Sequence, residues 1–97
     1  MSIYAILINM NKDVVIERIK DKYKKKDFHI TEDGYIFVSD PGLTKEVGEK
    51  VGLVDYEGPE DKQPVGLIIK QENVLGFYYG SFWEWMNNIN SPTSLGS

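Results

Sequence analysis

Residues 28–38 read FHITEDGYIFV, two short runs of strand-forming residues on either side of a polar segment that ends in glycine. Phe28–Ile30 and Tyr35–Val38 contain the aromatic and β-branched residues that strands favour. Thr31–Gly34 carries the polar residues and the glycine of a turn. The segment therefore predicts a β-hairpin.

On the N-terminal side of this hairpin, the sequence predicts a strand and then a helix. Ile3–Asn9 is a continuous apolar run, typical of a strand covered on both faces. Asn11 or Asp13 is a candidate N-cap for the helix that follows. Four apolar residues at helical spacing form its core-facing stripe: Val15, Ile16, Ile19 and Tyr23.

On the C-terminal side, Asp40–Gly42 contains a proline and a glycine that end the second hairpin strand. Thr44 is the expected cap of a short helix that ends near Gly52, with Val47 and Val51 facing inward. A surface loop over Asp55–Pro64 leads to a further strand at Val65–Lys70.

The remainder of the chain predicts one more strand and a last helix. Val74–Tyr79 follows a turn at residues 71–73 and has the composition of a strand. Ser81 and Glu84 have the spacing of a capping box, so we expect a helix from there to about Asn88.

This order of elements predicts an α+β fold, the ferredoxin-like split βαβ arrangement (βαββαβ) with an extra strand and a short C-terminal helix. We expect a single domain over residues 1–89 and a disordered tail over 90–97. Two helices would cover one face of the sheet. The other face would need a dimer partner, or the C-terminal aromatic residues, to cover it.

Composition excludes several kinds of site. The chain has no cysteine and one histidine, so it cannot form a disulfide framework or a Cys/His metal cluster, and we expect no metal and no cofactor. Its formal net charge is −4, which argues against nucleic-acid binding through phosphates. No apolar run is long enough to span a membrane, so we expect a cytoplasmic protein.

The charges are unevenly spread along the chain. Residues 12–26 hold seven bases and three acids, whereas residues 31–64 hold nine acids and three bases. The acidic segment is either an ordinary solvated loop or a surface that steers a basic partner. The residues expected to do the steering are Asp55, Glu57, Glu60 and Asp61.

Residues 77–86 read FYYGSFWEWM and form the most aromatic segment of the chain. We expect three of its residues to face the core (Phe82, Trp83 and Met86) and Trp85 to be the more exposed tryptophan. Tyr78, Tyr79 and Trp85 are then candidates for an interface with a partner or a second copy, since Trp and Tyr are enriched at binding hot spots. The alternative is that the whole segment is core.

No catalytic constellation emerges from the spacing of residues. The paired acids lie on predicted turns, loops and an exposed helix face, where carboxylates are poor general acids. His29 is expected to be exposed on the open face of the sheet, and it is the only histidine that any serine or threonine could use. Glycines 42, 48 and 52 do not form a phosphate-binding loop.

The opening run Ile3–Asn11 with the following helix and hairpin resembles small ferredoxin-like proteins, the virulence-associated ribonucleases and the CRISPR spacer-adaptation nucleases. These families carry an aspartate at the end of the first strand that is implicated in hydrolysis. Asn9 and Asn11 stand there in this chain, and an amide cannot act as a base. The resemblance implies a dimer-forming sheet that has lost its activity.

The function expected from these features is that of a non-enzymatic protein-binding module, a small acidic protein of the inhibitor, immunity or phage-accessory type that also forms a homodimer. Two alternatives remain open. One is a degenerate or atypical nuclease of the ferredoxin-like set, and the other is a protein that sequesters a small ligand between subunits.

Overall fold

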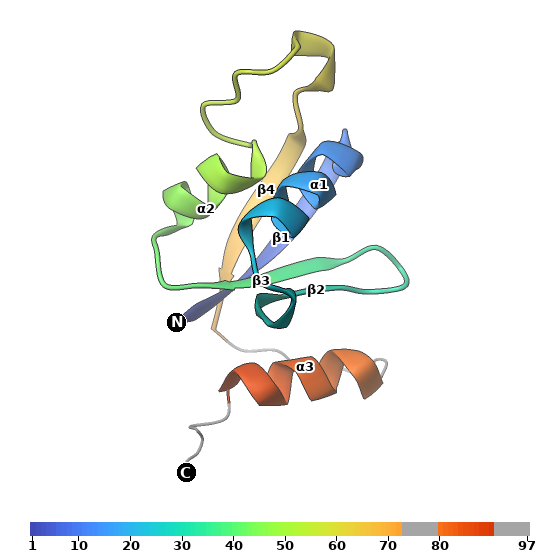
Figure 1. Ribbon diagram of the computed structural model, residues 1–97, viewed down its shortest axis with the longest axis vertical. Helices are drawn as coiled ribbons and strands as arrows, with labels where there is room; N and C mark the ends of the chain where they lie inside the picture. The colour runs from blue at the N-terminus through green and yellow to red at the C-terminus, as the bar shows by residue number, and fades with distance from the viewer. Residues whose placement is uncertain (73–79, 91–97) are drawn as a thin grey trace.

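The computed structural model describes residues 1–72 and 80–90 (Figure 1). In chain order the elements are β1 (Ser2–Met10), α1 (Lys12–Lys22), the 3-10 turn η1 (Lys25–Asp27), β2 (Phe28–Ile30), β3 (Ile36–Asp40), α2 (Thr44–Val51), the 3-10 turn η2 (Glu60–Lys62), β4 (Val65–Gln71) and α3 (Gly80–Asn90). The protein is α+β, as predicted. Because α3 follows β4, it is not a clean βαββαβ fold. The extra strand expected at Val74–Tyr79 lies outside the described residues.

The described strands form one antiparallel sheet in the order β2-β3-β1-β4. Ala5 of β1 lies opposite Phe37 of β3 on one side and Ile69 of β4 on the other. Successive side chains of a strand point to opposite faces, so these three residues share one face, and Tyr4 and Ile6 share the other. This alternation assigns the residues of β1 up to Ile8 and their partners to a face.

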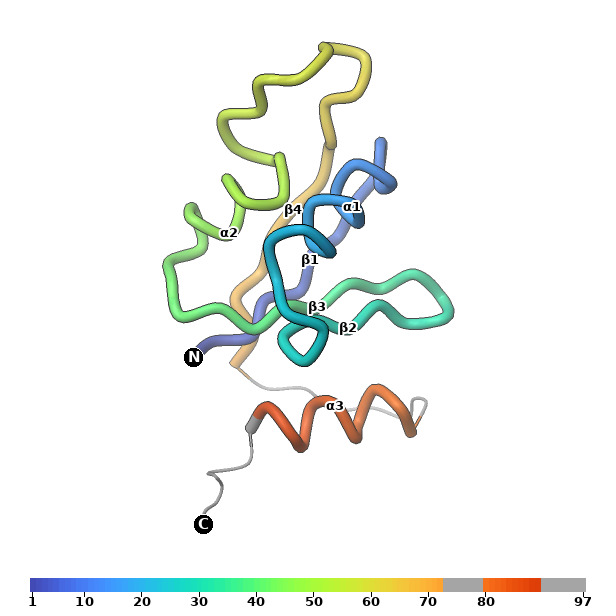
Figure 2. Tube along the Cα trace, in the orientation of Figure 1, coloured from blue at the N-terminus to red at the C-terminus, as the bar shows by residue number. Residues whose placement is uncertain are grey.

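The first face of the sheet is covered by α1 and α2, which lie side by side on it (Figure 2). Val15 and Ile19 of α1 are fully buried, which confirms the stripe predicted for this helix. Eight buried residues make this core: Tyr4, Ile6, Val15, Ile19, Ile36, Val38, Val47 and Val51. Both helices therefore stabilise the sheet from the same side.

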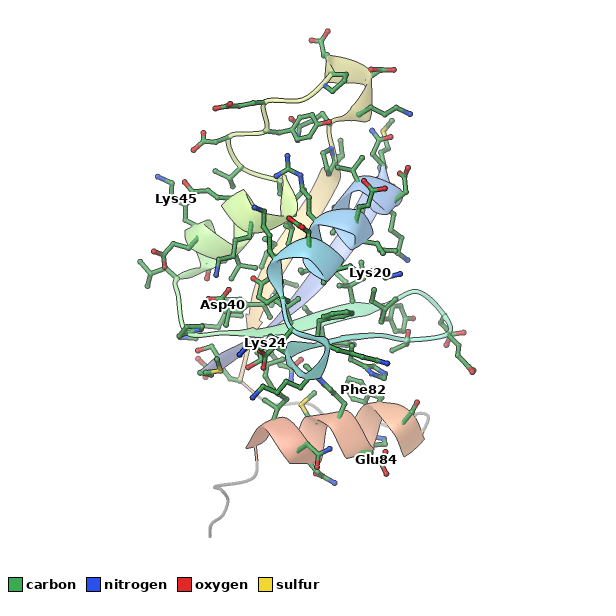
Figure 3. The ribbon with its side chains drawn as sticks, in the orientation of Figure 1. Lys20, Lys24, Asp40, Lys45, Phe82 and Glu84 are labelled. Carbon is green, nitrogen blue, oxygen red and sulfur yellow. The ribbon has the colours of Figure 1, made fainter. Side chains whose placement is uncertain are left out.

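The second face is covered at one end by α3, which packs on Ile3 and Phe37. Phe82 and Met86 are buried against the sheet, as predicted, and Figure 3 shows Phe82 pointing toward the sheet and Glu84 away from it. The prediction for the tryptophans was wrong. Trp85 is buried and Trp83 is only half-buried. Phe82, Trp85 and Met86 are the buried residues of α3, and the partly buried Ile89 continues their face at the usual i, i+3, i+4, i+7 spacing.

The ends of several elements differ from the sequence-based expectation. β3 begins at Ile36 because the Tyr35 amide donates to the Thr31 hydroxyl in the preceding turn, at 2.9 Å. Thr44 is the first residue of α2 and not its cap; the N-cap is Leu43, whose amide donates to Glu46 Oε1 at 2.6 Å. The helix ends at Val51 and Gly52 is its C-cap, in agreement with the predicted end near Gly52.

At the C-terminus, α3 begins at Gly80, so Ser81 lies inside the first turn and is not its cap. The helix extends to Asn90, which therefore belongs to the helix and not to the tail.

Candidate functional site

The part of the second sheet face that α3 leaves uncovered exposes a group of large apolar side chains. Leu7 of β1 lies opposite Leu67 of β4, and these residues are 45% and 66% exposed. Ile69 and Val65 follow on the same face of β4, and Tyr35 is exposed at the near end of the hairpin. We call these five residues the open patch: Leu7, Tyr35, Val65, Leu67 and Ile69.

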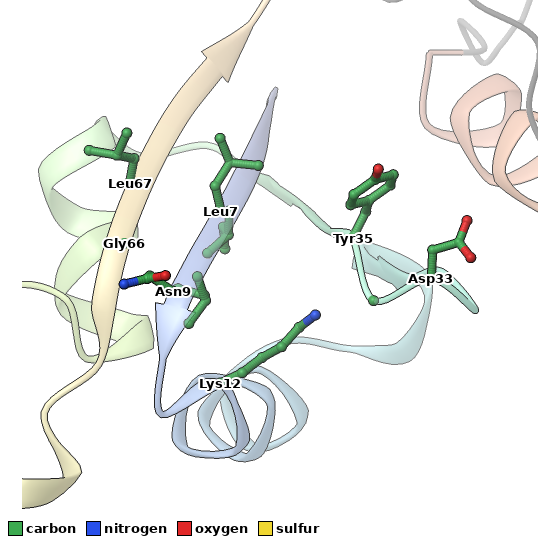
Figure 4. A pocket seen from close by; sticks show the side chains of 10 residues that line it. Leu7, Asn9, Lys12, Asp33, Tyr35, Gly66 and Leu67 are labelled. Atoms are coloured by element: carbon green, nitrogen blue, oxygen red, sulfur yellow. The ribbon is translucent and has the colours of Figure 1, made fainter.

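A hollow of about 390 Å³ lies within the open patch, between the end of β1 and the turn of the hairpin (Figure 4). It exists because β1 continues past Ile6, the last residue of β1 that pairs with β3. Leu7 and Leu67 give it an apolar wall, and Lys12 reaches from α1 toward the turn that carries Asp33. The hollow is therefore apolar on one side and holds one charge of each sign on the other.

Gly66 lets β1 and β4 approach closely beside this hollow. A Cβ on Gly66 would collide with the carbonyl oxygen of Leu7 and would lie 2.9 Å from Cα of Ile8. The pairing of the two strands shifts register between Ile8 and Met10, directly beside this contact. A residue without a side chain is required where two backbones come this close.

A turn around Thr31 fixes the opposite wall of the hollow. The Thr31 amide donates to the Tyr35 carbonyl at 2.9 Å, and the Gly34 amide donates to the Thr31 carbonyl at 2.9 Å. Gly34 has φ +91°, a left-handed conformation that glycine adopts without strain. The Lys12 ammonium lies against Gly34, where a Cβ would displace it. The turn thus holds Tyr35 at the edge of the open patch.

The predicted steering residues Asp55, Glu57, Glu60 and Asp61 are all exposed in the segment that leads to β4. The segment is held in place by Asn11, whose side-chain amide donates to the carbonyls of Asp61 and Gln63 at 3.1 and 2.9 Å. Figure 1 shows it at the end of the long axis opposite α3. The structure therefore separates these acids from Trp85.

Of the aromatic residues predicted to bind a partner, Trp85 is buried on the side of α3 that faces the sheet. Its indole N–H donates to the Lys26 carbonyl at 3.0 Å, which ties α3 to η1. Tyr78 and Tyr79 lie outside the described residues. Trp85 is thus a structural anchor, and the open patch is an apolar surface that the sequence did not predict.

His29 is also not exposed as predicted. It lies opposite Phe37 on the second sheet face, and its ring stacks on Trp85 with centroids 5.8 Å apart. It also contacts the ring of Phe82. Burial lowers the pKa of His29 below its ordinary value of 6.5, because the charged imidazolium is less well solvated there. The ring is therefore packed as a neutral aromatic side chain.

A buried carboxylate, Asp40, joins β3 to both helices of the first face (Figure 3). It accepts hydrogen bonds from the Tyr23 hydroxyl at 2.6 Å and from the Lys50 ammonium at 2.7 Å, while the Gly42 amide donates to its other oxygen. Burial acts to raise the pKa of Asp40, but the hydrogen bonds from Lys50, Tyr23 and Gly42 outweigh it and lower the pKa. The pKa of Tyr23 is raised, by burial first and then by Asp40. Asp40 is thus ionised in the folded protein and stabilises the turn between β3 and α2.

Within the described ranges, no three acidic or histidine side chains come together in a way that could hold a metal ion. The helices of those ranges are also too short or too polar to cross a membrane. No protein-family model, curated protein or solved structure matches this chain.

Proposed function

We propose that this protein is a protein-binding module that forms a homodimer through the open patch. The observation that carries the proposal is the position of Leu7, Leu67 and Ile69 on neighbouring strands of one sheet face, each with about half or more of its side chain exposed. Contiguous apolar surface of this kind marks interaction sites, because leaving it in water costs free energy that association recovers.

A second copy of the chain fits this surface well. Two sheet faces pack about 10 Å apart with their side chains interleaved. In a two-fold symmetric dimer, each apolar residue of the patch contributes to the interface from both copies. The hollow in the patch holds one lysine and one aspartate, Lys12 and Asp33, so two-fold symmetry can set each charge near its opposite in the other copy. A surface that carries one positive and one negative charge does not require a partner of the opposite net charge, so a second copy of the chain can bind it.

The acidic segment that leads to β4, residues 55–64, would then determine how the two copies are oriented relative to each other. It lies beside the Val65 end of the open patch, since β4 begins directly after it. A two-fold axis perpendicular to the long axis keeps the two acidic segments apart, whereas an axis along it brings like charges together. Asp55, Glu57, Glu60 and Asp61 therefore favour an antiparallel arrangement.

The same proposal includes kinship with the ferredoxin-like proteins. The strand order β2-β3-β1-β4 and the placement of α1 and α2 on one face support it. The position expected to carry a hydrolytic aspartate is occupied by asparagine, and the amide of Asn11 is engaged by the carbonyls of Asp61 and Gln63. This structural use of Asn11 favours binding over nuclease activity.

The test is the mass of the purified protein in solution, measured by sedimentation equilibrium up to high micromolar concentration. We expect a dimer for the natural chain and a monomer for Leu67→Lys, which places a charge at the centre of the open patch. Leu43→Lys is the matched control, because Leu43 is also an exposed leucine, 72% accessible, and lies at the start of α2 away from the patch.

Both variants should keep the circular dichroism of the natural chain, since neither side chain is buried. A monomeric natural chain at the highest concentration would refute the dimer. Equal masses for the Leu67 and Leu43 variants would show that the open patch is not the interface.

A further inference from the structure

A second surface, separate from the open patch, lies along the outer edge of β2. A groove of about 670 Å³ opens there between α1 and α3. Ile16 of α1 and Tyr23, the residue directly after α1, form one wall; Trp85 forms the other, and the strand itself is the floor. The hydrogen bond from Trp85 to the Lys26 carbonyl fixes the Trp85 wall to η1, the turn that leads into β2.

The floor of the groove is the edge of a sheet. β2 pairs with β3 on one side, and no other strand in residues 1–72 and 80–90 pairs with its other side. The Thr31 amide donates to the Tyr35 carbonyl across the hairpin, so the antiparallel alternation turns the backbone N–H and C=O groups of Phe28 and Ile30 outward into the groove. Such groups are a template for an added strand.

The rim of the groove is basic. Lys20 and Lys25 line it, and Lys24 and Lys26 are exposed beside it. Among residues 1–72 and 80–90, neither Lys20 nor Lys25 forms an ion pair, whereas Lys50 is paired with Asp40. This concentration of positive charge stands out in a chain whose net charge is −4. It selects an occupant with negative charge.

We propose that the groove binds an acidic segment of another protein in an extended conformation, which adds to the sheet as a strand beside β2. Its backbone pairs with Phe28 and Ile30, its apolar side chains enter between Tyr23 and Trp85, and its carboxylates meet Lys20 and Lys25. The acidic segment of a second copy does not fit this role, because its residues 60–62 form the 3-10 turn η2 and Asn11 pins its end. The partner is therefore a different chain.

The probe is a fluorescein-labelled nine-residue peptide in which valine alternates with glutamate, and the readout is fluorescence polarisation at low salt. We expect saturable binding that weakens about tenfold or more in the double variant Lys20→Glu, Lys25→Glu, because each change turns an attraction into a repulsion. The matched control is Lys45→Glu, Lys62→Glu, which makes the same change of charge at exposed lysines on α2 and η2 (Figure 3 shows Lys20 and Lys45). It should bind like the natural chain.

Three further probes separate strand addition from simple charge attraction. The same peptide with alternate backbone amides methylated should lose binding, since it cannot complete the ladder with β2. A valine–lysine peptide should not bind. A nine-nucleotide uridine RNA that binds as well as the acidic peptide would overturn the proposal.

Binding that survives methylation would overturn it as well, because charge alone would then account for the complex. If no peptide binds, the proposal is wrong, and the lysines only protect the edge of β2 from unspecific pairing. Neither the peptide result nor its failure depends on the open patch, so a monomeric protein can still pass this test.

Discussion

At the scale of single residues, Asp40 shows how a buried charge is retained in a small domain. Its carboxylate is inaccessible to solvent, yet it accepts hydrogen bonds from Tyr23, Lys50 and the Gly42 amide. Lys50 keeps part of its side chain in solvent, so the pair is only half desolvated. Hydrogen bonds to a charged group contribute more than neutral ones, because the charge strengthens each of them.

Replacing Asp40 with asparagine should lower the free energy of unfolding by about 1.5–3 kcal/mol at pH 7, the cost of losing hydrogen bonds to a charged group. The folded protein holds the pKa of Asp40 below its ordinary value of 3.8, so the unfolded chain binds the proton first as the pH falls. The ionised Asp40 therefore contributes its full stabilisation above about pH 5, and this stabilisation is lost as the pH falls through and below the ordinary pKa of an aspartate.

Urea denaturation of the natural chain and the variant at pH 7 and pH 3 checks this. The difference in the free energy of unfolding between the natural chain and the Asp40→Asn variant should be smaller at pH 3. Glu49→Gln, at an exposed position on α2, is the control and should show no such change. A difference that stays the same at both pH values would contradict a role for the Asp40 charge.

Gly66→Ala should destabilise the protein by about 1–3 kcal/mol, the range found when a packed site must accept an extra group. The new Cβ would meet the backbone of Leu7 and Ile8, which cannot move aside without disturbing the pairing of β1 and β4. Gly80→Ala is the control, since no atom lies within 4 Å of a Cβ at that position. Thermal unfolding of both variants is the measurement, and equal melting temperatures would contradict the close approach.

At the scale of elements, α3 is held on the sheet by the residues of one of its faces. Phe82, Trp85 and Met86 face the sheet, while Trp83 is half-buried at the side. Trp85→Ala should cost about 3–5 kcal/mol, the usual loss for a large aromatic side chain in a core. Trp83→Ala should cost clearly less. Chemical denaturation of both variants is the test, and equal losses would show that the two sides of α3 pack alike.

The elements themselves could be predicted from the sequence because their patterns are local. The apolar run of β1, the hairpin residues and the Val47–Val51 spacing of α2 were sufficient to predict where these elements lie. The orientation of α3 could not be predicted from the i, i+1, i+4 spacing chosen for it. That choice omitted Trp85, whose indole finds its acceptor at Lys26, far away along the chain.

The open patch was missed for a different physical reason. Alternation along β4 shows that Leu67 and Ile69 share a face, but not whether that face is covered. Coverage depends on where α3 packs, which is a tertiary property. The partners of Asp40 are likewise distant in sequence, so the residue types alone gave no sign of the Tyr23 and Lys50 contacts.

At the scale of the whole molecule, the sheet separates two hydrophobic cores. Eight buried residues form the core beneath α1 and α2, and four form the core beneath α3. Both tryptophans of the chain lie in α3, so tryptophan fluorescence reports on the second core, while far-ultraviolet circular dichroism reports on α1, α2 and α3 together. The two signals therefore weight the two cores differently in one sample.

We expect α3 to leave the sheet at a lower urea concentration than the one that unfolds the rest, because its core buries fewer apolar residues. Two substitutions make the test specific. Ile3→Ala removes a sheet residue of the second core, so it should move the fluorescence transition more than the dichroism transition. Val15→Ala weakens the first core and should move the dichroism transition more than the fluorescence transition, because the sheet is still folded when α3 leaves it. Transitions that coincide in the natural chain and in both variants would show that the two cores unfold as a single cooperative unit.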